Sequence, residues 1–549
     1  MEKFRPEPGA PSLFFLPALT IAATAFVVVL PFFFWGNPSG HDFEFHLFSW
    51  MEVLGQWKQG IVYPHWASLA HWGYGEARFL FYPPASWTLG ALVGSVFPWR
   101  MVPGIYIWIA LSASGFSMFL LARRWLDRKD AIFAAVLYTA NPYYIVIVYW
   151  RSAFAELLAG ALLPLLLLFV LRMEREGRRM VIPLALVVMA AWLTNAPSAV
   201  MVNYSLALLV VALAIIKKSP RIVVFGGASV VLGAALAAFY ILPAAYEEKW
   251  VNIAEVLAPG VRPQDNFLFT AINDPDHNRF NLLTSIVATA EIMILFACGW
   301  LARRWRDSRK ERWWLLVLWA SAAILLMLPV TAIFWLYLPE LRFVQLPWRW
   351  LLCLNVAFAL FVSMGLRLWF NRAVLCLGLL LVIASVWHRV QAPWWDNAAD
   401  IEEMHESVHT GEGYEGTDEY VPAGDDPYEL NKAAPLVSSD QAGSASVRIQ
   451  AWEAQTKEFS VDMNTPGTLV PRLFAYPAWR VEVNGQVVQT HAEPVTGQMT
   501  IPVTAGRNQV KITYERTRDQ KLGDAISVFT ALLLIFAGLV RRRASLRTS

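Results

Sequence analysis

Charged residues and cysteines are scarce in this sequence. Asp, Glu, Lys and Arg make up only 16% of its 549 residues, hydrophobic residues make up 57%, and the mean hydropathy is +0.43. This balance excludes an ordinary soluble globular protein and is typical of a polytopic membrane protein. The net charge of +3 provides no overall basic field that would attract nucleic acid, so no nucleic-acid partner is expected.

Several common functional motifs are also missing. The three cysteines, Cys298, Cys353 and Cys376, all lie within apolar runs, so no disulfide or thiolate zinc site is expected outside the membrane. The sequence contains no Walker A motif, no dinucleotide-binding glycine-rich loop and no nucleophile elbow. It therefore gives no support to a nucleotide-driven enzyme or a hydrolase.

Long apolar runs dominate the sequence instead. Residues 12–34 are long enough to cross the hydrocarbon core, which needs about 20 apolar residues. This run is too long for a cleaved signal, and the following WGNPSG lacks a small-x-small cleavage pattern. Together with later runs it predicts about twelve transmembrane helices. The later runs are 103–122, 131–149, 157–172, 180–195, 199–216, 222–241, 283–302, 313–337, 349–368, 373–388 and 525–540.

Arginine-rich connections indicate how these helices are oriented. Short basic loops are typical of the cytoplasmic side of a membrane, so we expect both termini in the cytoplasm. Residues 83–98 must then form a short interfacial or re-entrant helix, because a full span there would invert every later loop. The basic connections are 122–130, 172–180, 217–221, 303–312, 367–372 and 541–547.

This topology divides the chain into three parts. They are a transmembrane domain at 1–388 with a first external loop at 35–102, an external domain at 389–520, and a final span with a basic tail at 521–549. The external domain begins acidic and rich in Gly and Pro, and then alternates apolar and polar residues with period two. Asn484-Gly485 between two such runs is a strong hairpin signal. We therefore expect a mainly α-helical membrane protein that carries a small antiparallel β-sandwich outside the membrane.

The stretch SGHDFEFHLFSW, which starts at Ser39, places two acids and two histidines directly after the first span. On a helix over 42–59, Asp42 and His46 share a polar face, while Glu44 points away and aromatic residues cover the remainder. We expect an amphipathic helix at the outer membrane surface, with Asp42 in its first turn and Ser39 as its cap. A strand would instead place the two acids and His46 on one face, but the aromatic pattern fits a helix better. The helical spacing weakens a metal-site interpretation.

Seven stretches of the sequence, in order through about four-fifths of the chain, resemble a known family. It is the bacterial membrane-protein family labelled 6-pyruvoyl-tetrahydropterin synthase-related, a label that does not describe a pterin enzyme. The stretches are GHDFEFHLFSWMEVLGQWKQGIVYPHW (40–66), GYGEARFLFYPP (73–84), NPYYIVIVYWRSAFAELLAGALLPL (141–165), LTNAPSAVM (193–201), AAFYILPAAYE (237–247), LRFVQLPWRWL (341–351) and YPAWRVEVNG (476–485).

The family is similar in layout to the GT-C glycosyltransferases, and this resemblance implies an activity. GT-C enzymes carry an acidic residue in the first large external loop, and Asp42 occupies that place here. It would act as general base in an inverting transfer from a polyprenyl-phosphate sugar to an external glycan, lipid or protein acceptor. The resemblance also implies a location in the bacterial inner (plasma) membrane. No cofactor is expected, and a divalent metal is possible but has no support from the spacing.

Such a transfer needs cations near the leaving phosphate, because negative charge grows there in the transition state. Arg151, Arg342 and Arg349 are the candidates, since all lie at predicted outer ends of spans and guanidinium holds phosphate oxygens well. Glu156 could pair with Arg151, and His46 could orient Asp42 or bind phosphate. Arg151 and Glu156 could equally form a structural ion pair, and the other two arginines could be ordinary interfacial residues.

Other polar residues leave further interpretations open. Glu291 lies deep within a predicted span, where helix packing is as reasonable as a substrate role. His65 and His71 are too far apart for a local metal pattern. The loop 242–282 could cover the site or be an ordinary solvated turn.

Two other functional classes compete with the transferase. The first is a non-catalytic membrane protein that moves or presents a lipid-linked polymer and uses the external β domain as a binding module. The second is a transporter, which should have several ionisable groups at the membrane midplane, whereas only Glu291 meets that expectation.

Overall fold

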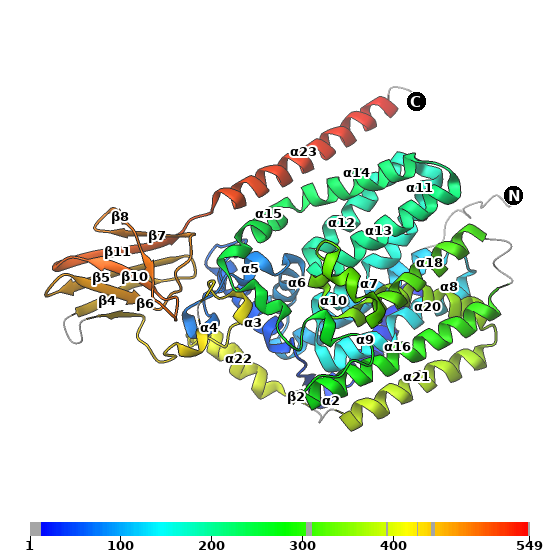
Figure 1. Cartoon of the computed structure of the whole chain (residues 1–549), viewed down its shortest axis with the longest axis horizontal. Coiled ribbons are helices and arrows are strands. Elements are labelled where there is room, and N and C mark those ends of the chain that lie inside the picture. Colours follow the sequence, from blue (N-terminus) through cyan, green and yellow to red (C-terminus); the bar gives the residue numbers. More distant parts are fainter. Residues whose placement is uncertain (1–11, 304–309, 391–393, 425, 441–444, 547–549) are drawn as a thin grey trace.

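The computed structural model describes residues 12–303, 310–390, 394–424, 426–440 and 445–546. A helical body is joined at one end to a region of β-sheets (Figure 1). Residues 304–309 of the predicted basic loop and the side chains of the predicted tail, 541–547, lie outside this description.

Apolar helices make up the body. Nine helices in the described part of the chain are long and apolar enough to cross a membrane, or up to eleven if each of two bent pairs counts as one span. The predicted total of about twelve is higher, partly because residues 154–194 count as one helical stretch that contains two predicted runs. The helices that form these spans are α1 (Ser12–Val29), α7 (Val102–Ala122), α8 (Arg128–Thr139), α11 (Leu162–Glu176), α12 (Val181–Thr194), α13 (Ala196–Lys217), α14 (Arg221–Leu236), α15 (Ala238–Glu247), α16 (Pro275–Leu301), α18 (Lys310–Leu326), α19 (Ala332–Tyr337), α20 (Leu351–Gly365), α21 (Trp369–Val390) and α23 (Arg518–Leu546).

Several basic connections lie together at the end of the body opposite the β-sheets (Figure 1). Lys217, the last residue of α13, binds Glu174 at 2.8 Å and also pairs with Glu311 at the start of α18. Arg372 of α21 binds Asp130 of α8 at 2.7 Å. The loops that the sequence assigns to one side of the membrane are therefore joined by ion pairs.

The first external segment forms short helices beside this bundle. Helix α3 (Phe43–Lys58) packs against α6 (Pro84–Gly94), where Gly90 lies so close to the Trp50 ring that a Cβ atom would come within 2.1 Å of it. At 1.5 Å per residue, the 11 residues of α6 span about 16 Å, too little to cross the hydrocarbon core. As predicted, α6 is a short helix that does not cross the membrane.

The C-terminal sheets are antiparallel throughout, as the alternation predicts. One sheet has the order β3-β6-β10-β9 and the other β4-β5-β11-β7-β8, and their inward side chains, such as Phe459 and Ile501, form a second buried core. Asn484 and Gly485 join β7 to β8 with φ angles of 53° and 80°, the left-handed backbone that this dipeptide favours. The strands are β3 (Val437–Ser439), β4 (Ala445–Trp452), β5 (Thr456–Met463), β6 (Gly467–Pro471), β7 (Trp479–Val483), β8 (Gln486–Val488), β9 (His491–Ala492), β10 (Met499–Val503) and β11 (Gly506–Tyr514).

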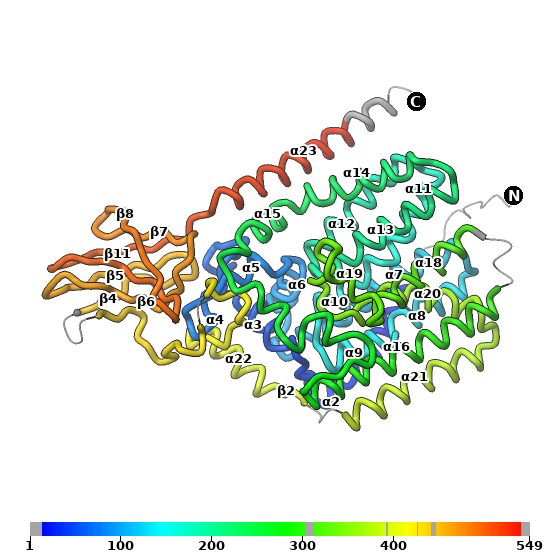
Figure 2. Tube along the Cα trace, viewed as in Figure 1, coloured from blue at the N-terminus to red at the C-terminus, as the bar shows by residue number. Residues whose placement is uncertain are grey.

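The segment between α21 and the sheets returns along the first external segment. The short strand β2 (Trp395–Asp396) pairs with β1 (Asn37–Pro38), and α22 (Ala398–Thr410) then runs toward α4 (Ala70–Gly73), as Figure 2 shows. The backbone of Tyr414 continues this contact by bonding to Leu69 and Trp72. Residues far apart in the sequence thus form one layer on the predicted external side, which we call the external layer.

A buried carboxylate joins the β-sheets to the helices. Glu247 of α15 is fully buried and accepts a hydrogen bond from the Tyr476 hydroxyl at 2.5 Å. Its other oxygen accepts bonds of 2.9 Å each from Thr517 and Gln520, where α23 begins. One side chain therefore connects three parts of the chain.

We expect Tyr476→Phe to destabilise the protein by about 1–3 kcal/mol, because it removes a hydrogen bond to a buried acid. The measurement is the unfolding temperature of the full chain in detergent. Tyr428→Phe is the matched control, since the Tyr428 hydroxyl also bonds to an acid, Asp418, but on the exposed surface. Equal unfolding temperatures for the two variants would contradict this role of Glu247.

Candidate functional site

Two buried arginines share one carboxylate at the centre of the candidate site. Glu156 of α10 (Phe154–Ala159) accepts hydrogen bonds from Arg151 Nη1 at 2.5 Å and from Arg349 Nε at 3.1 Å. The Tyr143 hydroxyl donates to the second Glu156 oxygen at 2.5 Å. All three charged side chains are at least nine-tenths buried, and together they carry a net charge of +1. The arrangement leaves one positive charge uncompensated by Glu156.

Asp42 lies beside this pair of arginines. Its backbone N–H donates to the Arg151 carbonyl oxygen at 2.9 Å, and its carboxylate is near enough to interact electrostatically with both Arg151 and Arg349. The close approach depends on Gly40, where a Cβ atom would come within 2.5 Å of the Trp150 carbonyl oxygen. The structure thus brings together three residues that the sequence singled out in three separate segments.

The start of α3 differs from the prediction in one respect. Asp42 itself occupies the N-cap position and its side chain makes no capping hydrogen bond. Ser39 does not cap the helix, since it lies before the turn, where its backbone N–H donates to the Trp394 carbonyl oxygen at 3.3 Å. The Asp42 carboxylate, which is partly exposed, is therefore not used to begin the helix.

His46 lies one turn further along α3 and faces the same region. Its ring is buried and stacks on Phe154 with centroids 5.2 Å apart. Burial lowers the pKa of His46 to about 4, with Arg78 and Arg151 acting in the same direction and Asp42 opposing them. His46 is consequently neutral at pH 7.

Two other candidates lie apart from this cluster. Arg342 is exposed, and its guanidinium lies 5.0 Å from the centre of the neighbouring Phe343 ring. Glu44 is exposed as well, on the opposite side of α3 from His46. Across the described ranges, no group of three or more His, Cys, Asp or Glu residues is arranged to hold a metal ion.

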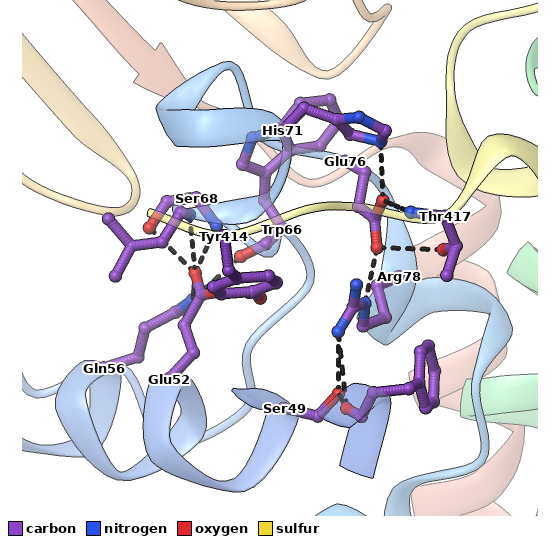
Figure 3. A network of polar contacts seen from close by, with 12 residues as sticks. Ser49, Glu52, Gln56, Trp66, Ser68, His71, Glu76, Arg78, Tyr414 and Thr417 are labelled. Atoms are coloured by element: carbon purple, nitrogen blue, oxygen red, sulfur yellow. Dashed lines mark hydrogen bonds and ion pairs between the residues drawn. The ribbon is translucent and has the colours of Figure 1, made fainter. Parts of the chain in front are cut away.

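The rest of the polar face of α3 is buried, whereas the sequence predicts a helix at the membrane surface with that face in solvent. Glu52 accepts hydrogen bonds from the Tyr414 hydroxyl at 2.5 Å and the Ser68 hydroxyl at 2.9 Å, as Figure 3 shows. Gln56 donates to the Trp66 carbonyl oxygen at 2.8 Å. These partners bond the Glu52 carboxylate and the Gln56 amide nitrogen without water, which is why the face can pack inside the protein.

A second buried acid belongs to the same network (Figure 3). Glu76 pairs with Arg78 and with His71, and it accepts a bond from the Thr417 backbone N–H at 2.8 Å. Burial alone would raise the pKa of Glu76, but Arg78, His71 and Thr417 lower it to about 2. Arg78 also donates to the Ser49 hydroxyl at 3.0 Å. This network holds α3 and the segment around Thr417 together.

The other polar residues that the sequence left open have local partners. In the loop 242–282, Asp274 caps α16 through the N–H groups of Asp276 and His277, as expected of an ordinary turn. His65 is buried against the Tyr514 ring, with centroids 5.6 Å apart. Glu291 is fully buried in α16 with Asn141 beside it.

Sequence reasoning missed several residues around the arginines. Arg349 Nη1 donates to Gln345 Oε1 at 2.9 Å, and the Arg151 guanidinium lies 4.8 Å from the centre of the Trp348 ring. Tyr143 and Tyr82 belong to the same region, since Tyr82 lies near enough to Asp42 and Arg349 to interact with their charges. Tyrosine and tryptophan are common at the ends of spans for reasons of membrane anchoring, so their presence gave no specific signal.

An apolar cavity of about 480 Å³ lies beside the helical turn that ends at Arg151. It is bounded by α1, α8, α9 (Pro142–Val146), α16 and α21, and Tyr149 and Trp150 form part of its wall. Its lining is almost wholly hydrophobic, with side chains such as Val28, Leu283 and Ile383. Such a cavity suits an apolar chain better than a polar molecule.

A family model described as 6-pyruvoyl-tetrahydropterin synthase related domain, membrane protein, matches residues 79–392. No curated protein sequence matches the chain.

Solved structures that the chain is similar to include three glycosyl-transferring enzymes. ArnT from Cupriavidus metallidurans, bound to undecaprenyl phosphate, is 11% identical, with 73% of this chain and 77% of that chain covered and a TM-score of 0.39. AglB from Archaeoglobus fulgidus, an oligosaccharyltransferase in complex with an inhibitory peptide and a dolichol-phosphate, is 12% identical over 73% and 56%, with a TM-score of 0.41. The arabinofuranosyltransferase AftD from Mycobacteria is 17% identical over 75% and 28%, with a TM-score of 0.39. These TM-scores are below 0.5 and do not establish a shared fold.

The neutral, buried state of His46 predicts a dependence of stability on pH. An unfolded histidine has a pKa near 6.5, so between pH 6.5 and about 4 the unfolded chain binds a proton that the folded protein does not. Stability is therefore present above pH 6.5 and falls as the pH decreases through this range, by about 3 kcal/mol in full. His46→Gln should reduce the drop in unfolding temperature between pH 7.5 and pH 5, measured in detergent.

His491→Gln is the matched control for this experiment, because His491 is exposed on β9. The two variants could instead lose the same amount of unfolding temperature between pH 7.5 and pH 5. That result would show that His46 titrates normally in the folded protein.

Proposed function

The chain belongs to the 6-pyruvoyl-tetrahydropterin synthase-related family of membrane proteins, and we propose that it is a membrane glycosyltransferase with a polyprenyl-phosphate sugar as donor. The observation that carries the proposal is the convergence of Asp42 with two buried arginines beside an apolar cavity. A base, a phosphate-binding pair and a place for a lipid chain are the three requirements of such a transfer. The proposed site faces the outside of the bacterial inner membrane, with both termini in the cytoplasm.

Asp42 is the proposed general base. Its carboxylate takes the proton of an acceptor hydroxyl while that oxygen attacks the anomeric carbon from the side opposite the phosphate. The bond between the anomeric carbon and the phosphate oxygen breaks, and the lipid phosphate leaves with the electron pair. A single displacement of this kind inverts the configuration of the anomeric carbon.

Arg151 and Arg349 are the proposed phosphate-binding residues. Fixed positive charge in a buried site stabilises the negative charge that grows on the leaving phosphate. Glu156 positions both guanidinium groups through its hydrogen bonds and compensates only one of their two positive charges. His46 is neutral at pH 7 and could accept or donate a single hydrogen bond near Asp42. Arg342 is exposed, and we assign it no contact with the phosphate.

The apolar cavity beside Arg151 supports a lipid-linked donor. Its lining of span side chains suits an isoprenoid chain, and Trp150 in its wall directly precedes Arg151 in the sequence. The acceptor would approach from outside, where Asp42 is partly exposed, and belongs to the class of external glycans, lipids or proteins that carry a free hydroxyl.

The base assignment predicts that Asp42→Asn lowers sugar transfer by about 100-fold or more, because the amide cannot accept the proton. Transfer is measured in membranes of cells that express the protein, with a radiolabelled polyprenyl-phosphate sugar as donor. Glu44→Gln is the matched control, since Glu44 lies two residues away on α3 and is exposed. Undiminished transfer by an Asp42→Asn protein that inserts normally would favour a non-catalytic role in presenting a lipid-linked polymer.

The phosphate assignment predicts that Arg349→Lys lowers transfer by about tenfold or more, because lysine cannot donate from a planar fork to both Glu156 and Gln345. The same assay measures the effect. Arg342→Lys is the control of equal chemistry, and we expect it to retain nearly full transfer because Arg342 lies on the surface. A larger loss in Arg342→Lys than in Arg349→Lys would reverse the assignment.

A further inference from the structure

A second cavity of about 480 Å³ lies between α3, α22 and the turn that joins β4 to β5. Unlike the first cavity, it is lined by many polar and charged side chains. Two tryptophans also belong to its lining. We infer that this cavity binds an acidic saccharide, at a site separate from Asp42. Asp42 and Gln56 lie 14 residues apart on the same helix, which corresponds to about 21 Å along its axis.

The walls of the cavity are fixed by internal hydrogen bonds. Lys457 of β5 is buried and donates to the carbonyl oxygens of Glu453 at 2.6 Å and Ala454 at 2.9 Å. The Ala454 backbone N–H donates to Gln59 Oε1 at 3.1 Å, which ties the β4–β5 turn to the end of α3. Glu52 in the floor is bonded to Ser68 and Tyr414 (Figure 3). The cavity is thus formed in advance of any ligand.

Two buried polar atoms in the lining have unused hydrogen-bonding capacity. Gln56 is 2% exposed, and within the described ranges its Oε1 accepts no hydrogen bond. Arg472 Nε is likewise buried and donates none there, although Nη1 donates to the Trp72 carbonyl oxygen at 3.3 Å. A buried polar atom without a partner costs about 1–3 kcal/mol, so a ligand with both donors and acceptors is favoured. The hydroxyl groups of a saccharide supply both.

The aromatic residues and the charges narrow the class of ligand. Trp99 and Trp452 line the cavity and offer flat apolar ring faces, against which the C–H groups of a sugar ring can pack. Lys58 and Arg472 outnumber Glu453, because Glu52 is already fully bonded. Lys457 adds little to this balance, since it is bonded to two carbonyl oxygens and burial lowers its pKa to about 7. The cavity therefore favours a saccharide that carries carboxylates, such as a chain of uronic acids.

The opening of the cavity lies at the surface of the external layer. Gln59, His409 and Glu453 are exposed residues of the lining, whereas Gln56 and Lys457 lie at its buried end. A saccharide can therefore enter from the outside without displacing the first external segment. Binding here does not require the transfer reaction, so the inference stands apart from the proposed function.

Direct binding to the purified full chain in detergent tests the inference. The probe is tetragalacturonic acid, followed by intrinsic tryptophan fluorescence and by calorimetry, and the neutral comparison is maltotetraose. We expect saturable binding of the acidic probe with a Kd of about 1 mM or tighter, and weaker binding of the neutral one. No saturable binding of either probe up to about 10 mM would overturn the inference, and equal binding of both would overturn the preference for acid.

Variants identify the cavity as the site of binding. Arg472→Gln and Lys58→Gln should each weaken binding of the acidic probe by about tenfold. Arg448→Gln, an exposed residue of β4 outside the cavity, should bind as the unmodified protein does. Unchanged affinity in both cavity variants would overturn the assignment, with unfolding temperatures to establish that each variant is folded.

Asp42→Asn separates the two proposals. Because Asp42 lies outside the cavity, this variant should bind tetragalacturonic acid with unchanged affinity whatever its effect on transfer. Loss of binding in Asp42→Asn would contradict a separate site, and loss of transfer alone would leave the saccharide site intact.

Discussion

The contact between Glu156 and two arginines determines how the helical body is built around the proposed site. A buried charge without a partner costs several kcal/mol, and two like charges at one buried place cost more. Glu156 removes this cost for Arg151 and Arg349, although Arg349 is 193 residues away in the sequence. The π-helical turn that ends at Arg151 and the helical turn that contains Arg349 are therefore held against each other, and Asp42 comes to lie beside them.

The same requirement organises the external layer. Glu52 and Glu76 are buried, and each is satisfied by partners from segments near residues 68–78 and 414–417. These acids stabilise the packing of α3 and have little capacity left for a ligand. Asp42 differs, because it begins the helix without capping it and keeps a partly exposed carboxylate. A charged group is therefore available for chemistry only where it has unused hydrogen-bonding capacity.

Helix α3 connects the two proposed sites. Its first turn lies at the arginine cluster beside an apolar cavity, and its last turns form the floor of a polar cavity against the β-sheets. The β4–β5 turn closes the second cavity through Ala454 and Gln59, so the C-terminal sheets take part in shaping the external layer. One rigid helix thereby fixes the spacing between the proposed site of transfer and the proposed site of saccharide binding.

Local properties of the sequence determined the general plan of this protein. Hydropathy predicted the spans, and period-two alternation predicted the strands. The order of the segments showed that Asp42 directly follows the first span. Each of these patterns depends on a few neighbouring residues only. The tertiary structure alone decided which arginine joins Arg151: Arg349 does and Arg342, seven residues earlier, does not. It also decided that the polar face of α3 is buried, since the Tyr414 hydroxyl that satisfies Glu52 comes from 362 residues away. Burial of a polar group depends on such distant partners, and no local pattern records them.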